Sequence, residues 1–215
     1  MNRVTELLSA GSEAIGPGPR EIPSILTRYP LGNDVFDMLR RKNGFYAFES
    51  SLHVFPAAPA GEGHIDLDAW NSEDLWRGTY NDLSAGLLFF AEDIFQDQFC
   101  LSPKGIVRFE AETGDKEHFA DSLETWANLL LEDFSYQTGW RLASEWQQIH
   151  GPIPIGKRLM PKIPFFLGGE FSMDNLWAGE SVAGMRAKGD LAIQTRNLPD
   201  GSKVTLRVGP RPERP

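Results

Sequence analysis

The chain has 215 residues, of which 21 are glycine and 15 are proline, and its formal net charge is −9. So many turn-forming residues argue against a coiled coil or an all-helical bundle. Its wholly apolar runs are only a few residues long, as at 87–91, whereas a membrane-spanning helix needs about 20 residues. The sequence therefore predicts a folded protein that contains both helices and strands and has no membrane partner.

The cysteine content and the N-terminus both bear on the cellular compartment. The single cysteine, Cys100, cannot form an internal disulfide. Its acidic and apolar neighbours favour a packed, inert thiol over a reactive one. Thr5 and Glu6 lie where a signal peptide would need an unbroken apolar core. We therefore expect a cytoplasmic protein.

The charge is distributed unevenly along the chain. Residues 49–135 contain 4 basic and 18 acidic side chains, a net charge of −14, whereas residues 136–215 contain 11 basic and 7 acidic side chains. The acidic block would repel a phosphate backbone and attract a basic protein. We expect no direct nucleic-acid binding. The alternatives are that the block only keeps the surface soluble, or that it pairs with the basic C-terminal segment.

The predicted elements up to residue 149 alternate between helices and short strands. They are a loosely structured segment over 1–30, a helix over 33–42, strands over 45–55, a short helix over 68–80, strands over 87–91, 98–101 and 106–109, and helices over 122–133 and 140–149. Gly16-Pro17-Gly18-Pro19 breaks any regular structure near the N-terminus. Asn33 can cap the first helix. Asp121 and Glu124 have the spacing of a capping box, which makes the helix over 122–133 the clearest pattern.

We predict a main domain over 31–135, followed by a C-terminal extension over 136–208 that packs on it. The prolines between residues 152 and 164 indicate an extended, turn-rich chain. Residues 191–196 and 204–208 flank Leu198-Pro199-Asp200-Gly201, which is typical of a β-hairpin. We expect residues 209–215 to form a disordered tail.

No set of residues stands out as catalytic or metal-binding. The histidines are not spaced three or four residues apart, as two ligands on one helical face would be. The segment that begins at Asp66 lacks the glycine and the final glutamate of a calcium loop. Glu92 with Asp93, and Glu110 with Glu112, are carboxylate pairs of the kind used in acid–base catalysis, but acidic residues are dense enough here for chance pairing. We predict no catalytic residue, no metal and no cofactor.

Residues 33–134 resemble the SUKH superfamily, which includes yeast cell-wall assembly regulators and many bacterial immunity proteins. The resemblance rests on the segments Phe90-Ala91-Glu92-Asp93, Gln98-Phe99-Cys100-Leu101, Gly105-Ile106-Val107 and Glu112-Thr113-Gly114, and on the helix start at 121–126. The extension is similar to one found in some bacterial members. The resemblance implies an α+β fold with a mixed, mostly antiparallel sheet packed against helices, and an extension that contains a helix and a β-hairpin.

The resemblance also implies a non-enzymatic binding protein, which in bacteria is typically an immunity protein that blocks a partner toxin, often a nuclease. Because such toxins present basic surfaces to nucleic acid, an acidic protein can occupy those surfaces. The expected contact residues lie on a loop between two strands: they are Glu92, Asp93, Gln96, Asp97 and Gln98. Members of the superfamily often have glycine where this chain has Gln96, so we expect an altered turn there and do not carry over a shared ligand contact at that loop.

Two other functions remain open at this stage. One is a regulatory or scaffold protein without a toxin partner, as the yeast relatives suggest. The other is an enzyme that acts on a small molecule or nucleotide through the carboxylate cluster. The enzyme alternative requires a concave pocket around carboxylates with strongly shifted pKa values.

Overall fold

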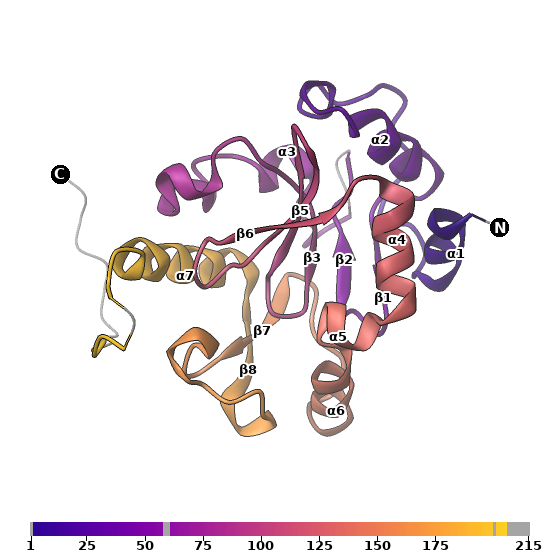
Figure 1. Ribbon diagram of the computed structural model, residues 1–215. Helices are drawn as coiled ribbons and strands as arrows, with labels where there is room; N and C mark the ends of the chain where they lie inside the picture. The colour runs from indigo at the N-terminus through magenta and orange to yellow at the C-terminus, as the bar shows by residue number, and fades with distance from the viewer. Residues whose placement is uncertain (1, 58–60, 200, 206–215) are drawn as a thin grey trace.

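The computed structural model describes residues 2–57, 61–199 and 201–205 (Figure 1). At its centre is a six-stranded sheet in which each strand pairs antiparallel with the next one along the chain. The strands are β1 (Phe45–Ala47), β2 (Leu52–Val54), β3 (Leu88–Asp93), β4 (Gln98–Ser102), β5 (Gly105–Phe109) and β6 (Lys116–Ala120). Helices pack on this sheet, so the predicted α+β class is confirmed. The pairings within the described residues are all antiparallel, rather than mixed.

Both faces of the sheet are covered, as β3 illustrates. Every residue of β3 is buried. The ring of Phe90 contacts Trp126 on α4 (Leu123–Glu132), with their centroids 5.2 Å apart. The neighbouring Phe89 points to the other face and meets Trp76 at 4.8 Å. An unbroken apolar run therefore forms a strand here because it has a partner layer on each side.

The N-terminal segment is more ordered than the sequence indicates. Residues 3–10 form the helix α1 (Arg3–Ala10), which buries Val4, Leu7 and Leu8 against α4. The carboxylate of Glu124 accepts hydrogen bonds from the backbone N–H groups at the start of α1. The prediction of a loosely structured segment over 1–30 is therefore wrong for α1. It is also wrong for the short 3₁₀ turn η1 (Leu26–Arg28).

Two predicted helices are present but begin differently from expectation. The helix predicted over 33–42 is α2 (Gly32–Arg41), which starts after Leu31 without a side-chain cap, so Asn33 is not its cap. In α4 the capping side chain is Ser122, which accepts a hydrogen bond from the Thr125 N–H. Because Ser122 takes that place, Glu124 is free to bind α1 instead of closing a capping box with Asp121.

The opposite face of the sheet carries a chain of short turns instead of the single helix predicted over 68–80. These elements are α3 (Leu67–Trp70), η2 (Arg77–Thr79) and η3 (Asn81–Ser84). Trp70, Trp76 and Tyr80 are almost fully buried, and their rings contact one another in series. The Tyr80 ring reaches Phe109 at 5.1 Å, so this aromatic layer closes the core on that side.

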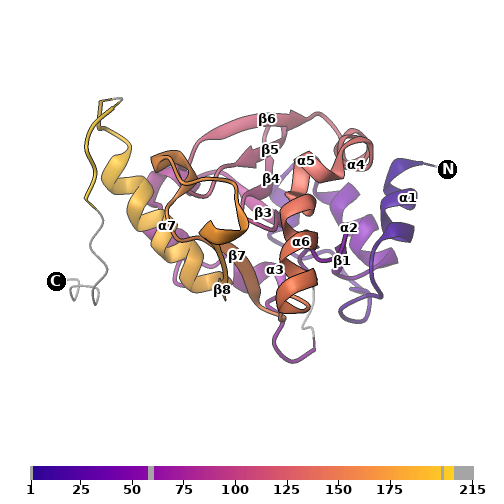
Figure 2. The same cartoon turned by 90° about the horizontal axis from the view of Figure 1, so that it is seen from below.

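The C-terminal extension forms a second, smaller layer at one end of the sheet (Figures 1 and 2). It comprises α5 (Phe134–Thr138), α6 (Trp140–His150), β7 (Lys157–Pro161), η4 (Phe165–Leu167), η5 (Met173–Asn175), β8 (Leu176–Glu180) and α7 (Ser181–Thr195). The helix predicted over 140–149 is confirmed as α6. Strands β7 and β8 pair antiparallel. A second apolar cluster joins Ile94 of the main domain to Trp146, Leu159 and Leu176 of the extension.

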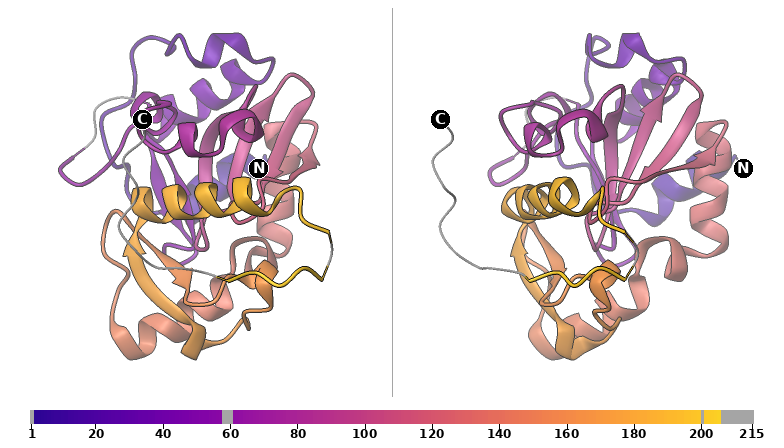
Figure 3. Two further views of the ribbon diagram at one scale, coloured as in Figure 1. Left: turned by 90° about the vertical axis from the view of Figure 1, so that its left-hand side faces the viewer. Right: turned by 60° about the vertical axis from the view of Figure 1, so that its left-hand side comes forward.

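The β-hairpin predicted around Leu198-Pro199-Asp200-Gly201 is wrong, because residues 191–195 belong to α7. This long helix crosses the end of the sheet beside η2 (Figure 3). The other half of the predicted hairpin lies largely outside the described residues, as does the predicted tail over 209–215. No helix in the described part of the chain has the length and apolar character needed to cross a bilayer.

Candidate functional site

The five residues predicted to contact a partner lie at the turn between β3 and β4, but the turn is not exposed. Glu92, Asp93, Gln96 and Gln98 are each at most 2% exposed, and only Asp97 is partly accessible. The prediction of a surface contact loop is therefore wrong for four of the five. The reason is that the C-terminal extension covers this turn.

The turn itself is tight, although a glutamine occupies the expected glycine position. Gln96 has φ +73°, in the left-handed region that usually favours glycine. Asp93 stabilises the turn because its Oδ1 accepts hydrogen bonds from the N–H groups of Phe95 and Asp97, at 2.8 and 3.0 Å. The Gln96 side chain extends into the extension, where Nε2 donates to the Ser181 carbonyl at 2.6 Å. The glutamine thus keeps the turn and attaches it to the start of α7.

Glu92 forms a buried ion pair with the extension. Its Oε1 accepts from Arg158 Nε at 2.8 Å and lies 3.1 Å from His53 Nδ1, while Oε2 accepts from Gln98 Nε2 at 3.3 Å. Burial alone raises the pKa of Glu92, but the charge of Arg158 and the contact with His53 outweigh it and hold that pKa below its usual range. Part of the acidic block is therefore paired inside the molecule with the basic C-terminal segment.

Asp93, Asp97 and Arg108 form a second charged group, on the other side of the turn. Arg108 Nη2 lies 2.7 Å from Asp93 Oδ2 and 3.3 Å from Asp97 Oδ2. Its Nη1 donates to the Gln137 carbonyl at 3.2 Å, which links the group to α5. Burial and the negative charge of Asp97 raise the pKa of Asp93 to about 7, against the opposing effect of Arg108. One cation is thus shared between two carboxylates.

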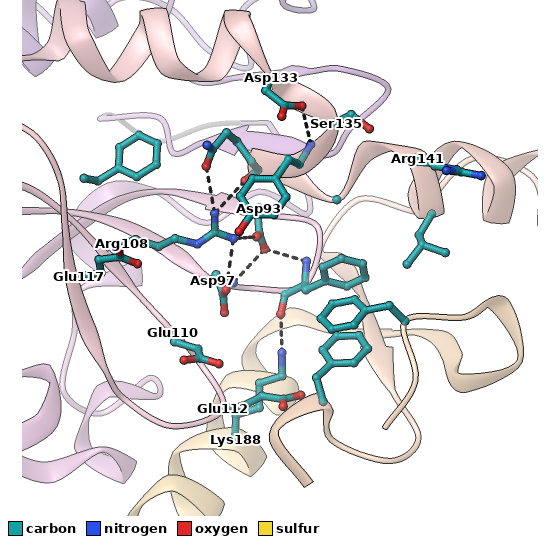
Figure 4. A pocket seen from close by; sticks show the side chains of 18 of the residues that line it. Asp93, Asp97, Arg108, Glu110, Glu112, Glu117, Asp133, Ser135, Arg141 and Lys188 are labelled. Atoms are coloured by element: carbon teal, nitrogen blue, oxygen red, sulfur yellow. Dashed lines mark hydrogen bonds and ion pairs between the residues drawn. The ribbon is translucent and has the colours of Figure 1, made fainter. Parts of the chain in front are cut away.

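This second group forms one wall of an open cleft of about 870 Å³ (Figure 4). The cleft lies between the ends of β3–β6, helices α5 and α6, and the segment around η4. Its charged lining is predominantly acidic, with six carboxylates and three cations: Asp93, Asp97, Glu110, Glu112, Glu117, Asp133, Arg108, Arg141 and Lys188. Its aromatic lining comprises Phe95, Phe119, Tyr136, Phe165 and Phe171.

Glu110 and Glu112 line the same wall, Glu110 at an exposed position and Glu112 buried beside Lys188 (Figure 4). Burial, assisted by the charge of Asp97, raises the pKa of Glu110. Burial also raises the pKa of Glu112, and Lys188 opposes the increase. The Lys188 ammonium donates to the Phe95 carbonyl. Glu112 is 4% exposed, and its Oε2 accepts from the Phe166 N–H at 3.1 Å.

Two aromatic side chains at the cleft are unusually exposed for their size. Tyr136 on α5 is 77% exposed and Phe171, between η4 and η5, is 65% exposed. The Phe171 ring stacks on Phe165 with centroids 3.9 Å apart and an angle of 6° between the planes. Exposed aromatic rings beside a polar depression are typical of protein-binding surfaces.

The sequence identified only part of this cleft. Glu110 and Glu112 were recognised as a carboxylate pair, but Arg108, Tyr136, Phe171 and Lys188 were not connected with them. Arg108 did carry a signal, because it is one of only 4 basic residues within 49–135. The exposure of Tyr136 and Phe171 depends on the path of the extension, and no local pattern reveals it. In the described residues, no three histidine, cysteine or carboxylate groups gather so that they could hold a metal ion.

Comparison with known proteins supports the fold and goes no further. No protein-family model and no curated protein matches the chain. Among solved structures, the chain is similar to Atu4351 from Agrobacterium tumefaciens, with a TM-score of 0.54 and 11% sequence identity. The similarity covers 85% of this chain and 86% of that chain, so it includes the extension as well as the main domain.

Proposed function

We propose that this chain is a non-enzymatic protein-binding module of the SUKH type, most simply a bacterial immunity protein. It would neutralise a basic cognate toxin, for example a nuclease, in the cytoplasm by covering the toxin's active site. The observation that carries this proposal is the cleft, in which carboxylates outnumber cations two to one beside two exposed aromatic rings. The sequence resemblance of residues 33–134 supports the same function.

Charge and aromatic surface have separate parts in this proposal. The acidic lining favours the encounter with a basic surface and disfavours wrong partners. The rings of Tyr136 and Phe171 supply the apolar area that a stable interface requires at its centre. The contact residues proposed now are Asp97, Glu110 and Glu117 with these two rings, in place of the buried turn residues.

The test is to capture the partner with the tagged full chain from a lysate of its native organism, at low and at high salt. We expect one stoichiometric basic protein, retained less at high salt, that inhibits growth when expressed alone and not when co-expressed with this chain. Capture of cell-wall or signalling proteins instead would favour the regulatory or scaffold alternative. Capture of a protein whose toxicity this chain does not relieve would contradict the immunity function.

The enzyme alternative is favoured by one specific observation. The cleft is concave and contains Asp93, Glu110 and Glu112, whose pKa values are all raised, that of Asp93 to about 7. However, Asp93 has both carboxylate oxygens engaged by the turn and by Arg108, so it has a structural role that leaves no oxygen for a substrate. Turnover of a small molecule that Glu112→Gln abolishes, in a protein that still folds, would establish the enzyme.

A further inference from the structure

Glu112 has a feature that the fold does not explain. The residue is 4% exposed and lines the cleft, yet its Oε1 has no hydrogen-bond partner in the described part of the chain. A buried carboxylate oxygen without a donor is unfavourable, and folded proteins seldom leave one. Because the other oxygen is held by the Phe166 N–H, Oε1 is the acceptor at this wall of the cleft that the described residues leave without a donor.

The surroundings of Glu112 favour a positively charged donor. Glu110 and Asp97 line the same wall. Arg108 pairs with Asp93 as well as with Asp97, so it neutralises the negative charge of Asp97 only in part. The nearby Lys188 donates to the Phe95 carbonyl, and its positive charge offsets part of the negative charge of Glu112. This part of the cleft therefore has more negative charge than its own cations balance, and an incoming cation would be attracted to it.

The aromatic side of the cleft favours a planar cation. Glu112 binds the backbone of η4, whose Phe165 stacks on the exposed Phe171. A guanidinium group can lie against an aromatic face while its N–H groups bind a carboxylate, whereas an ammonium group binds as a point charge. Carboxylate acceptors and ring faces thus occur together at the same end of the cleft.

We infer that this end of the cleft receives an arginine side chain, whose guanidinium donates to Glu112 Oε1 and lies against the Phe165–Phe171 pair. The inference rests on the proposed function, because the arginine would belong to the bound toxin. It deepens that proposal by naming the group that is recognised. Glu110 and Asp97 stabilise the positive charge of the guanidinium electrostatically.

The first test uses the full chain, labelled with ¹⁵N, and three peptides: acetyl-Gly-Arg-Gly-amide and its lysine and citrulline counterparts. Citrulline has nearly the shape of arginine without the charge. We expect the arginine peptide to shift the amide resonances of residues 110–112 and 165–171, and to bind about tenfold more tightly than the citrulline peptide. Equal binding of arginine and citrulline peptides, or shifts confined to other regions, would overturn the inference. Equal binding of the lysine peptide would overturn the assignment to arginine.

Variants of the chain make the test specific. Glu112→Gln keeps an acceptor for the Phe166 N–H but removes the charge, and we expect it to weaken arginine-peptide binding about tenfold. Glu110→Gln provides the same test at an exposed position, where folding is not at risk. Glu21→Gln removes an exposed charge that does not line the cleft, and binding should be unchanged. Loss of binding in Glu21→Gln equal to that in Glu112→Gln would show that only overall charge matters, and would reject the site.

The inference and the proposed function can fail separately. If a toxin is captured and Glu112→Gln binds it as tightly as the parent chain, the arginine site is wrong and the immunity function stands. If the arginine peptide binds as expected while the captured protein is not toxic, the cleft recognises arginine but the immunity function is wrong.

Discussion

Arg158 in β7 donates from Nε to Glu92 Oε1 in β3 over 2.8 Å, and both side chains are almost completely buried, at 3% and 2% exposure. The two residues are 66 positions apart in the sequence. One belongs to the main domain and the other to the extension. Their pairing means that the extension is an integral part of the folded unit and determines which acidic residues remain at the surface.

The first prediction concerns this ion pair. Arg158→Met should lower the free energy of unfolding by about 3–5 kcal/mol, because it leaves Glu92 buried without its cation. Urea unfolding followed by tryptophan fluorescence measures the change. Combining Arg158→Met with Glu92→Leu should restore much of the loss, since an apolar pair no longer contains a buried charge. Arg141→Met, in an exposed pair with Glu145, serves as the control. Equal losses at Arg158 and Arg141 would contradict the prediction.

The second prediction concerns the pH dependence of stability. Asp93 has a folded-state pKa of about 7, above its unfolded value of 3.8. Its contribution to stability is therefore complete below pH 3.8 and is lost as the pH rises towards 7. Asp93→Asn removes this loss, so the stability of the variant relative to the parent chain should rise between pH 4 and 7, by at most about 1.4 kcal/mol per pH unit.

Urea unfolding at several pH values tests the second prediction, and His53 provides a control of opposite sign. Burial lowers the pKa of His53 from 6.5 to about 4, so the stability that it contributes is lost as the pH falls from 6.5 to 4. His53→Gln should therefore gain relative stability as the pH falls through that window. Asp34→Asn, at an exposed position on α2, should show neither trend. Parallel pH profiles for Asp93→Asn and Asp34→Asn would refute the prediction.

The third prediction separates backbone strain from side-chain attachment at Gln96. Gln96→Ala and Gln96→Gly both lose the hydrogen bond to Ser181, but only alanine keeps a Cβ at φ +73°. We expect Gln96→Gly to be more stable than Gln96→Ala by about 1 kcal/mol, as measured by thermal or urea unfolding. If alanine is as stable as glycine, the left-handed conformation carries no measurable strain.

The fourth prediction concerns the exposed aromatic rings. Tyr136→Ala and Phe171→Ala should each weaken binding of the captured partner by about tenfold or more, with little change in folding stability. Ile149→Ala is the matched control, because Ile149 is 71% exposed on α6 and does not line the cleft. Calorimetric titration of the purified partner measures the affinities. The same loss at Ile149 as at Tyr136 would place the interface elsewhere.

The sequence predicted the helices and strands whose buried residues recur at regular spacing along the chain. It missed those whose buried residues do not. Helix α4 and the β4–β5 hairpin have regular patterns and clear turn residues, and both are present. Strand β6 was missed because its first three residues are exposed and polar. Helix α7 was mistaken for half a hairpin because it buries glycines as well as apolar residues, so its buried face has no apolar stripe. At Gly189 a Cβ would lie 2.3 Å from Thr79 Oγ1, so the glycine is required by close packing.

The candidate site was predicted less well than the fold, for a physical reason. The density of acidic residues indicated the part of the chain that contains the cleft, and Asp97 does line that cleft. Whether Glu92 or Gln96 is exposed depends on residues 66 and 85 positions away, Arg158 and Ser181. Such pairings cannot be inferred from one sequence by local spacing. The free oxygen of Glu112 likewise follows only from the position of the extension.

Two of the walls of the cleft differ in how far they can change through evolution. One wall consists of strand ends and of a turn held by buried ion pairs, where substitutions would disturb the core. The other is the segment between β7 and β8, with the turns η4 and η5 and the exposed Phe171. Substitutions in this segment can reshape the cleft while the six-stranded sheet stays intact. The shape of the cleft can therefore change through one surface segment while the scaffold stays constant.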